Sequence, residues 1–129
     1  MTKIIYKVPS IIDKESIIVK AYPGIPRKRK IGEIEIANYL TEDCYRIENF
    51  EVDKAFREQG VGKELFNRAE EVVKKLGGTH ILVYPAPIPT EESIPLEELY
   101  IIYQHLRFRF TKVNVNLKES SHEMIKYIF

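Results

Sequence analysis

Apolar and polar residues alternate along the first third of the chain in a pattern that predicts three short strands. Residues 3–8 and 16–22 are rich in β-branched and aromatic side chains, and a turn-forming proline follows each of them. Residues 31–40 form the third strand, in which isoleucine and glutamate alternate from 33 to 36. Residues 41–43 are expected to form the next turn. This pattern predicts an antiparallel meander that leads into the centre of the chain.

The centre of the chain changes to a strand, a glycine loop, a helix and a second strand. Residues 45–52 are an apolar-rich strand, and residues 53–56 form a short linker. The glycine loop at residues 57–62 opens a helix whose apolar residues recur at spacings of three and four before Gly77 and Gly78. Residues 79–84 form the second strand. A βαβ crossover of this minimal length predicts two parallel, neighbouring strands.

The last third of the chain predicts a loop, a helix and a hairpin. Residues 85–95 are rich in proline, which fits either a wall of a binding cleft or a stiff spacer. A helix is expected from near Pro95, followed by a strand that begins at residues 107–110 and carries a bulge near residues 111–112. Residues 123–129 are expected to form the final strand.

Length and composition fit one domain that spans residues 1–129. The net charge of +1 gives no bulk attraction toward nucleic acid or a charged membrane. Cys44 is the single cysteine, which excludes an intrachain disulfide and fits a reducing compartment. The polar start of the chain does not resemble a secretory signal, and no apolar run approaches the roughly 20 residues of a membrane span. We therefore expect a cytoplasmic protein without a membrane partner.

Two glycines at the start of the central helix predict a site for an anion. Gly60 and Gly62 have no Cβ, so the backbone can turn sharply and a ligand can approach it closely. The first amides of a helix have no intrahelical partner, and the macrodipole adds partial positive charge there. Arg57 and Lys63 flank the loop with full positive charges. A phosphate group fits this environment, although a helix after a tight turn with nothing bound gives the same pattern.

The spacing of these residues resembles the acetyl-CoA signature of the GNAT superfamily of N-acetyltransferases, Gln/Arg-x-x-Gly-x-Gly/Ala. Here residues 57–62 read Arg-Glu-Gln-Gly-Val-Gly, directly after a strand and its Val-Asp end. Residues 47–53 also resemble the fourth strand of the family, and residues 99–108 resemble its late helix. The resemblance implies an α/β fold of GNAT type, with a mixed, mostly antiparallel sheet, a central βαβ unit and a splayed parallel strand pair.

The resemblance also implies a reaction, in which an acetyl group passes from acetyl-CoA to a primary amine by direct attack in a ternary complex. The acceptor is expected to be a small-molecule or protein amine. The residues that the resemblance assigns to acetyl-CoA binding are Phe50, Glu51, Val52, Arg57, Gln59, Gly60, Val61, Gly62 and Lys63. The amides of residues 59–63 bind the pyrophosphate, and the strand edge at residues 50–52 pairs with the pantetheine arm.

Tyr103 matches the general acid of the family, a tyrosine that protonates the leaving thiolate, and Tyr100 is the second choice. The group that takes the proton from the amine is less well defined. Some family members use a glutamate on the fourth strand, at a position that Arg46 occupies here. By strand parity Glu48 and Glu51 lie on opposite faces, and Glu51 lies nearer the thioester, so Glu51 is the candidate base. A solvent-facing role fits both glutamates as well.

Other reactive residue types are not expected in the site. His80 and Cys44 lie at the starts of their strands, whereas ligands of parallel strands bind at the carboxyl ends. No cluster of side chains has metal-ligand spacing. Acetyl-CoA is therefore expected to act as the co-substrate without a metal.

Two features depart from the family pattern. Residues 9–15 alone separate the first two strands, where the family usually places one or two helices that help to build the acceptor site. Arg107 stands where the family usually has glycine, and a positive φ there would strain the arginine. The acceptor side is expected to be open or to be completed by a partner subunit. These departures support an alternative function, a non-catalytic acyl-CoA-binding or regulatory module on the same scaffold.

Two further functions use other parts of the chain. Residues 27–30, with Arg107 and Arg109, offer basic side chains to a nucleic acid. A basic run at a hairpin tip is more often a solvated turn, so nucleic acid is not the expected partner. The edge of the last strand, residues 123–129, is a candidate surface for pairing in a homodimer.

Overall fold

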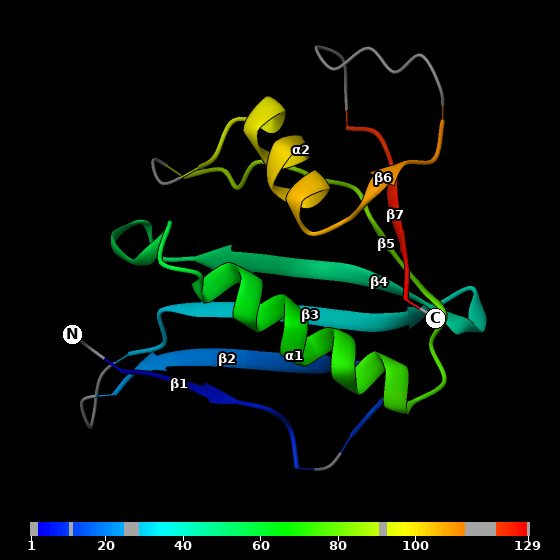
Figure 1. The fold of residues 1–129 in the computed structure, drawn as a ribbon, viewed down its shortest axis with the longest axis horizontal. Helices are drawn as coiled ribbons and strands as arrows, with labels where there is room; N and C mark the ends of the chain where they lie inside the picture. The colour runs from blue at the N-terminus through cyan, green and yellow to red at the C-terminus, as the bar shows by residue number, and fades with distance from the viewer. Residues whose placement is uncertain (1–2, 11, 25–28, 91–92, 113–120, 129) are drawn as a thin grey trace.

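A computed structural model describes residues 3–10, 12–24, 29–90, 93–112 and 121–128 of the chain. Within these ranges it contains seven strands and two α-helices (Figure 1). The elements in chain order are β1 (Ile4–Lys7), β2 (Ile17–Pro23), β3 (Gly32–Tyr39), β4 (Thr41–Val52), the 3-10 helix η1 (Lys54–Phe56), α1 (Val61–Lys75), β5 (His80–Val83), α2 (Leu96–His105), β6 (Arg109–Phe110) and β7 (Met124–Tyr127).

The strands form one mixed sheet in the order β1-β2-β3-β4-β5-β7-β6. Neighbouring strands are antiparallel except for β4 and β5, which are parallel as the βαβ pattern predicts. Their pairing joins residues 44–46 to residues 80–82, and β4 then continues to Val52 without β5 beside it. Figure 1 shows β5 and β7 turning away from the group β1–β4. The predicted fold class, with its splayed parallel pair, is confirmed.

The three N-terminal strands are confirmed as β1, β2 and β3, but the turn predicted at residues 41–43 is wrong. Leu40 turns the chain with a positive φ of 66°, and β4 begins directly at Thr41. The side-chain amide of Asn38 donates hydrogen bonds of 2.9 to 3.2 Å to three carbonyl oxygens of β4. These bonds hold the polar residues after Leu40 in the strand, although their composition is typical of a turn.

Helix α1 lies across β2, β3 and β4 and covers one face of the sheet (Figure 1). Its apolar residues recur every three or four positions, so they form one buried stripe. The residues of this stripe are Val61, Leu65, Phe66, Ala69, Val72 and Val73. Tyr100 and Tyr103 of α2 join them in a single hydrophobic core. Burial of this stripe, rather than helix propensity, is the main source of stability for α1.

The opposite face of the sheet carries no helix within the described residues. The buried side chains of both helices lie in the core on the α1 face. Between β1 and β2 the described residues form a turn, in which Asp13 and Ser16 make a β-bridge. Cys44 and Leu82 are buried outside the core, because they alternate with core residues along β4 and β5. The sheet face opposite α1, called the open face below, is therefore left without helical cover.

Cys44 provides a test of how tightly the open face is packed. Its side chain is only 3% exposed, and burial raises the pKa of its thiol. Because the thiolate is the reactive form, we expect Cys44 not to react with DTNB in native buffer and to react fully in denaturing guanidinium. The absorbance of the released thionitrobenzoate measures both rates. Fast reaction in native buffer would show that this part of the sheet is open to solvent.

Strand β4 contains a bulge that the alternation of the sequence did not predict. Ile36 of β3 pairs with Ile47, whereas Glu35 pairs with Asn49, so Glu48 is an extra residue in β4. An extra residue shifts the alternation of the strand by one position. Residues 49–52 therefore lie on the faces opposite to those that simple alternation along β4 predicts.

The end of α2 confirms the strain expected at Arg107, whose φ is +77°. The N–H of Arg107 donates to the carbonyl of Gln104 at 3.0 Å, and the N–H of Phe108 donates to that of Tyr103 at 2.9 Å. This is a helix end that glycine forms without cost. We expect Arg107→Gly to raise the free energy of unfolding by about 1 kcal/mol, because a residue with a Cβ is strained at this φ.

Urea unfolding followed by circular dichroism measures this effect. Arg109→Gly is the matched control, because Arg109 has an ordinary backbone in β6 and glycine weakens a strand. We expect Arg109→Gly to be less stable than the wild type. A stability of Arg107→Gly equal to or below that of the wild type would contradict the account of this helix end.

The final hairpin is confirmed as β6 and β7, but the predicted free edge of the last strand is wrong. β7 returns along β5, and β6 pairs with Met124 and Ile125 on its other side, so β7 is not an edge strand along these two residues. The edges of the described sheet are β1 and β6. The strand parity predicted beyond residue 112 lies outside the described residues.

Candidate functional site

A cleft of about 730 Å³ lies where β4 and β5 separate. The last three residues of β4 line one side of it, and the loop before α1 closes one end. Residues of the proline-rich loop and of α2 form the facing wall. Because the β4–β5 pairing stops at residue 46, the main chain of residues 50–52 is unpaired on this side. The cleft thus contains a free strand edge beside a helix N-terminus.

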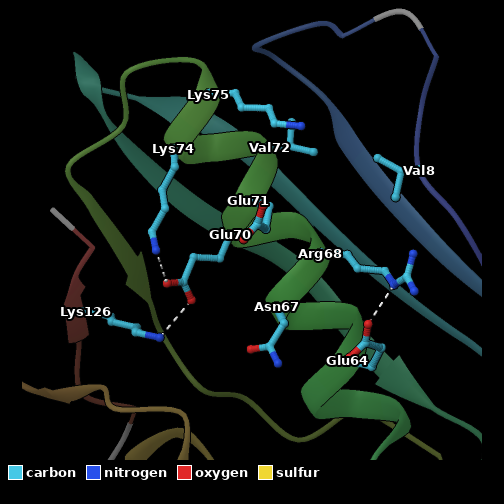
Figure 2. Close-up of a pocket in the computed structure, with 10 residues that line it drawn as sticks. All are labelled: Val8, Glu64, Asn67, Arg68, Glu70, Glu71, Val72, Lys74, Lys75 and Lys126. Carbon is cyan, nitrogen blue, oxygen red and sulfur yellow. Dashed lines mark hydrogen bonds and ion pairs between the residues drawn. The ribbon is translucent and has the colours of Figure 1, made fainter.

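A second hollow, of about 720 Å³, runs along the solvent side of α1 (Figure 2). Most of its charged side chains pair with one another. Glu70 is paired with Lys126 at 2.8 Å and with Lys74 at 3.4 Å, and Arg68 pairs with Glu64 at 2.8 Å. Figure 2 shows the side chains of Lys74 and Lys126 converging on Glu70. These pairs satisfy each other, so the cleft at the splay is the candidate site.

The loop before α1 is tied to the end of β4. The Nε of Arg57 donates a hydrogen bond of 2.9 Å to the carbonyl of Val52. The side-chain amide of Gln59 donates one of 3.1 Å to the carbonyl of Ala55 in η1. Glu58 and Gly60 have positive φ angles of 63° and 80°, so the chain bends sharply here. Glycine adopts this conformation freely, which explains why the motif has Gly60 directly before the helix.

The first turn of α1 presents free amides toward the cleft. The first helical hydrogen bond runs from the N–H of Glu64 to the carbonyl of Gly60 at 3.0 Å. The amides of Val61, Gly62 and Lys63 precede that bond and have no acceptor within the helix. A Cβ placed on Gly60 would meet nothing within 4 Å, so the space in front of the helix is open. Free amides, the helix dipole and open space together make a site for a phosphate group.

Tyr103 is the tyrosine of α2 that lines the cleft. Its side chain is 6% exposed, and its ring lies edge-on to Phe50 and Phe108, with centroids 6.2 and 5.4 Å away. Burial raises the pKa of its phenol, which therefore stays protonated through the neutral range. Tyr100 does not line the cleft, and its hydroxyl accepts a hydrogen bond from the N–H of His122 at 3.1 Å. The geometry favours Tyr103 over Tyr100 as a proton donor.

Parity predicted that Glu48 and Glu51 lie on opposite faces of β4. This prediction is wrong, because both lie on the open face. Glu48 is held by Arg46, whose Nη2 lies 3.0 and 3.2 Å from the two carboxylate oxygens. Glu51 lies in register with Glu33, a residue of the open face, and is exposed at the cleft. The bulge at Glu48 is the physical reason, since it shifts the alternation of β4 by one residue.

A sequence comparison identifies the family to which these features belong. The model of the acetyltransferase (GNAT) family matches residues 17–95, which is more than half of the chain. The chain belongs to the GNAT family. The matched segment includes the free edge of β4, the glycine loop and the whole of α1.

Solved GNAT structures share this fold at low sequence identity. A GNAT acetyltransferase from Staphylococcus aureus Mu50 superposes with a TM-score of 0.67 and 15% identity, over 88% of this chain and 68% of that one. The PaiA N-acetyltransferase from Thermoplasma acidophilum, solved with coenzyme A, gives 0.66 and 17%, over 88% and 62%. An IAA acetyltransferase from Bacillus cereus ATCC 14579 gives 0.68 and 14%, over 98% and 100%. No curated protein sequence matches the chain.

The cleft brings together most of the residues that the GNAT signature predicts. Those that line it are Phe50, Glu51, Val52, Arg57, Gly62 and Tyr103. Gln59, Gly60, Val61 and Lys63 do not line the cleft and lie beside it, at the start of α1. A Cβ on Gly62 would lie 3.6 Å from the ring of Phe50, which is an ordinary van der Waals contact, so the start of α1 lies beside Phe50 of β4. Val61 is 1% exposed, so its side chain belongs to the core rather than to a ligand site.

Several residues of the cleft were missed by the sequence reasoning. They are Lys54, Glu58 and Glu98 among the charged residues, His105, and the apolar residues Leu99, Ile101 and Ile102 of α2. The proline-rich loop was considered as a cleft wall, and its residues 86–88 and 94 confirm that reading. Ile101 and Ile102 carry a signal that was available, because they are apolar residues outside the buried face of α2. They are 52% and 39% exposed.

The other predicted sites find no support in the described residues. Arg29 pairs with Asp53 at 3.0 Å, and Lys30 pairs with Glu33 at 2.9 Å, while residues 27–28 lie outside the description. His80 begins β5, at the end of the parallel pair remote from the cleft. The described residues contain no group of three or more potential metal ligands. No helix among them is long and apolar enough to cross a membrane.

Proposed function

We propose that this GNAT protein transfers an acetyl group from acetyl-CoA to a primary amine by direct attack in a ternary complex. One observation carries the proposal: the free edge of β4, the open N-terminus of α1 and Tyr103 meet in a single cleft. Two solved GNAT structures with the same fold, PaiA and an aminoglycoside 6′-N-acetyltransferase, are complexes with coenzyme A. They support acetyl-CoA as the co-substrate.

The pyrophosphate of acetyl-CoA binds at the start of α1 in this proposal. The amides of residues 59–63 lie there, and the side chains of Arg57 and Lys63 add positive charge. Arg57 is already fixed by its bond to the carbonyl of Val52, so little of its freedom is lost on binding. This arrangement fits the anionic end of the co-substrate.

The pantetheine arm extends from the pyrophosphate along the free edge of β4. Its amides pair with the main chain of residues 50–52, as an added strand would. This path leads from the start of α1 toward the point where β4 and β5 meet. A backbone N–H near Phe50 is then placed to polarise the thioester carbonyl.

Tyr103 acts as the general acid when the thioester breaks. The amine nitrogen attacks the carbonyl carbon, the new C–N bond forms, and the C–S bond breaks to leave a thiolate. The phenol of Tyr103 gives its proton to that sulfur. Its buried position keeps the phenol protonated before the reaction. Glu51, exposed at the cleft, stays the sequence-based proposal for the group that deprotonates the amine.

The acceptor in this proposal is a small-molecule or protein amine that approaches from the open face. The absence of a helix over that face, within the described residues, supports an acceptor side with free access. The single buried cysteine fits a reducing compartment and supports a cytoplasmic location.

Thiol release from acetyl-CoA tests the proposed activity directly. A panel of primary amines and amine-bearing peptides is incubated with the protein and acetyl-CoA, and free thiol and product mass are followed. We expect thiol release that requires an amine, together with a product heavier by one acetyl group. Release of thiol at the same rate without any amine would contradict amine acetylation.

A non-catalytic acyl-CoA-binding module is the second candidate. The observation that favours it is the Arg46–Glu48 ion pair, at 3.0 Å, which occupies the β4 position where some family members have a catalytic glutamate. This function predicts coenzyme A binding without thiol release for any amine of the panel. A binding titration with coenzyme A, together with the thiol-release assay, therefore separates the two candidates.

A further inference from the structure

The narrow end of the splay is flanked on the open face by Glu48 on β4 and by the pair Tyr84–Glu123 beyond β5. We propose that Glu123 binds the ammonium group of the acceptor and takes its proton. This inference rests on the proposed acetyl transfer, because it names the group that receives the amine. It assigns amine binding and deprotonation to a carboxylate beside β7, rather than to one on β4.

Strand register places Tyr84 and Glu123 side by side. Val83 of β5 pairs with Met124 of β7, so the next residues outward, Tyr84 and Glu123, also face each other. Directly paired residues of antiparallel strands point to the same face. Val83 and Met124 are buried in the core, so Tyr84 and Glu123 point to the open face. The negative charge of Glu123, close to the phenol of Tyr84, raises the pKa of that phenol.

The same register places this pair at the start of the splay. Arg46 and Leu82 are the last paired residues of β4 and β5. Two residues further along the chain lie Glu48 on β4 and Tyr84 after β5, so the gap between the strands opens between them. A pantetheine arm that runs along β4 from the start of α1 brings its thioester toward this point.

Glu123 is better prepared to receive a cation than Glu48. The Glu48 carboxylate is occupied by Arg46, whose guanidinium also stacks over the ring of Tyr39 at 4.0 Å. Glu123 instead faces the neutral phenol of Tyr84 across the strand pair. A carboxylate beside a neutral phenol has lone pairs left for an ammonium. Its half-buried position strengthens that attraction.

Glu51 is less well placed for the same step. It lies three residues beyond Glu48, which is about 10 Å along a strand, and it borders the loop before α1. That position is beside the pantetheine and pyrophosphate in the proposed complex rather than at the thioester. Glu123 therefore takes the role that the sequence assigned to Glu51.

The class of acceptor that fits is a primary ammonium on an aliphatic arm, with the ring of Tyr84 beside its methylene groups. Glu123 accepts one proton from the ammonium, and the neutral nitrogen attacks the thioester carbon. The C–N bond forms and the C–S bond breaks, and Tyr103 protonates the sulfur. The amide nitrogen loses its second proton to water. Glu123 then releases its proton to solvent and Tyr103 takes one back from solvent, so one of the two protons from the ammonium balances the new thiol and one is released.

Titration of n-butylammonium into the full chain, labelled with ¹⁵N and followed by NMR, tests the inference. n-Butanol is the uncharged control ligand, and both are titrated with and without saturating coenzyme A. We expect n-butylammonium, and not n-butanol, to shift the amides of Tyr84 and Glu123. Glu123→Gln should weaken this binding at least about tenfold, as expected for loss of a charge-assisted hydrogen bond. The spectrum of the variant also shows whether it is folded.

Glu35→Gln is the matched control variant, because Glu35 lies on the open face in β3 and has its own partner, Ser16, at 3.0 Å. It should bind n-butylammonium like the wild type. Should Glu123→Gln fail to fold, Glu123→Asp keeps the charge on a shorter arm and is expected to weaken binding as well. Absence of shifts at Tyr84 and Glu123, equal shifts with n-butanol, or weakening by Glu51→Gln instead would overturn the inference. Ammonium binding without coenzyme A binding would keep this site and remove acetyl transfer.

Discussion

Gly60→Glu is expected to abolish coenzyme A binding while the protein stays folded. The new carboxylate lies at the free amides of α1, where the account places the pyrophosphate, and the space there is open to receive it. Two unit charges about 4 Å apart repel by about 4 kcal/mol at an effective dielectric constant of 20. Gly60 is exposed, so we expect a smaller loss, of at least about 100-fold in affinity. Calorimetric titration of coenzyme A measures it.

Gly60→Gln is the matched control for charge. Both variants place a side chain at a φ of 80°, which costs about 1–2 kcal/mol of stability in either case. Glutamate at a helix N-terminus recovers about 0.3–1 kcal/mol of that cost, so loss of folding does not explain loss of binding. We expect Gly60→Gln to bind coenzyme A more tightly than Gly60→Glu by at least about tenfold. Equal affinities would show that charge at this position does not matter to the ligand.

Tyr103→Phe is expected to lower kcat about 100-fold or more while the affinity for acetyl-CoA stays unchanged. Removing a positioned general acid typically costs this much, and the phenylalanine ring keeps the edge-on packing against Phe50 and Phe108. Burial raises the pKa of the Tyr103 phenol, so the wild type should show no loss of activity from its ionisation below about pH 10. Steady-state rates with the acceptor found in the amine panel measure both effects.

Tyr100→Phe separates catalysis from packing. It removes a hydroxyl from the same helix, but that hydroxyl bonds the backbone of His122 outside the cleft. We expect nearly normal kcat and a loss of about 1 kcal/mol in the free energy of unfolding. If Tyr100→Phe lost the activity and Tyr103→Phe retained it, the assignment of the general acid would be wrong.

The glycine loop and α1 could be predicted from sequence because their information is local. Gly60 must adopt a positive φ, and the apolar residues of α1 recur with helical spacing. The parallel pair follows from the short crossover itself, since consecutive strands lie side by side in roughly two-thirds of cases. The residues of the acetyl-CoA signature are contiguous in the sequence, so they lie close together in the fold.

Features that depend on pairing between distant strands could not be predicted. The bulge at Glu48 arises from the β3–β4 register. Because of it, Glu51 lies on the same face as Glu48, whereas parity predicted opposite faces. The turn at Leu40 depends on the bonds of the Asn38 amide. The place of β7 between β5 and β6 depends on how the final hairpin folds back. None of these has a signal in residue spacing.

The wall of the cleft was predicted only in part for a similar reason. The proline-rich loop is conspicuous in the sequence, whereas the rotation of α2 decides which of its side chains face the cleft. Tyr103 and Ile102 line it, while Tyr100 turns into the core. That rotation is set by packing of Tyr100 and Tyr103 with the aromatic residues of β4 and β6.

NMR titration of coenzyme A into the ¹⁵N-labelled protein tests the central claim most directly, because it reports where the ligand binds. The account predicts saturable shifts in the amides of residues 50–52 and 59–63 and in α2, around the cleft at the splay. Shifts confined to the groove along the outer side of α1 (Figure 2), or no shifts in the folded protein, would contradict it.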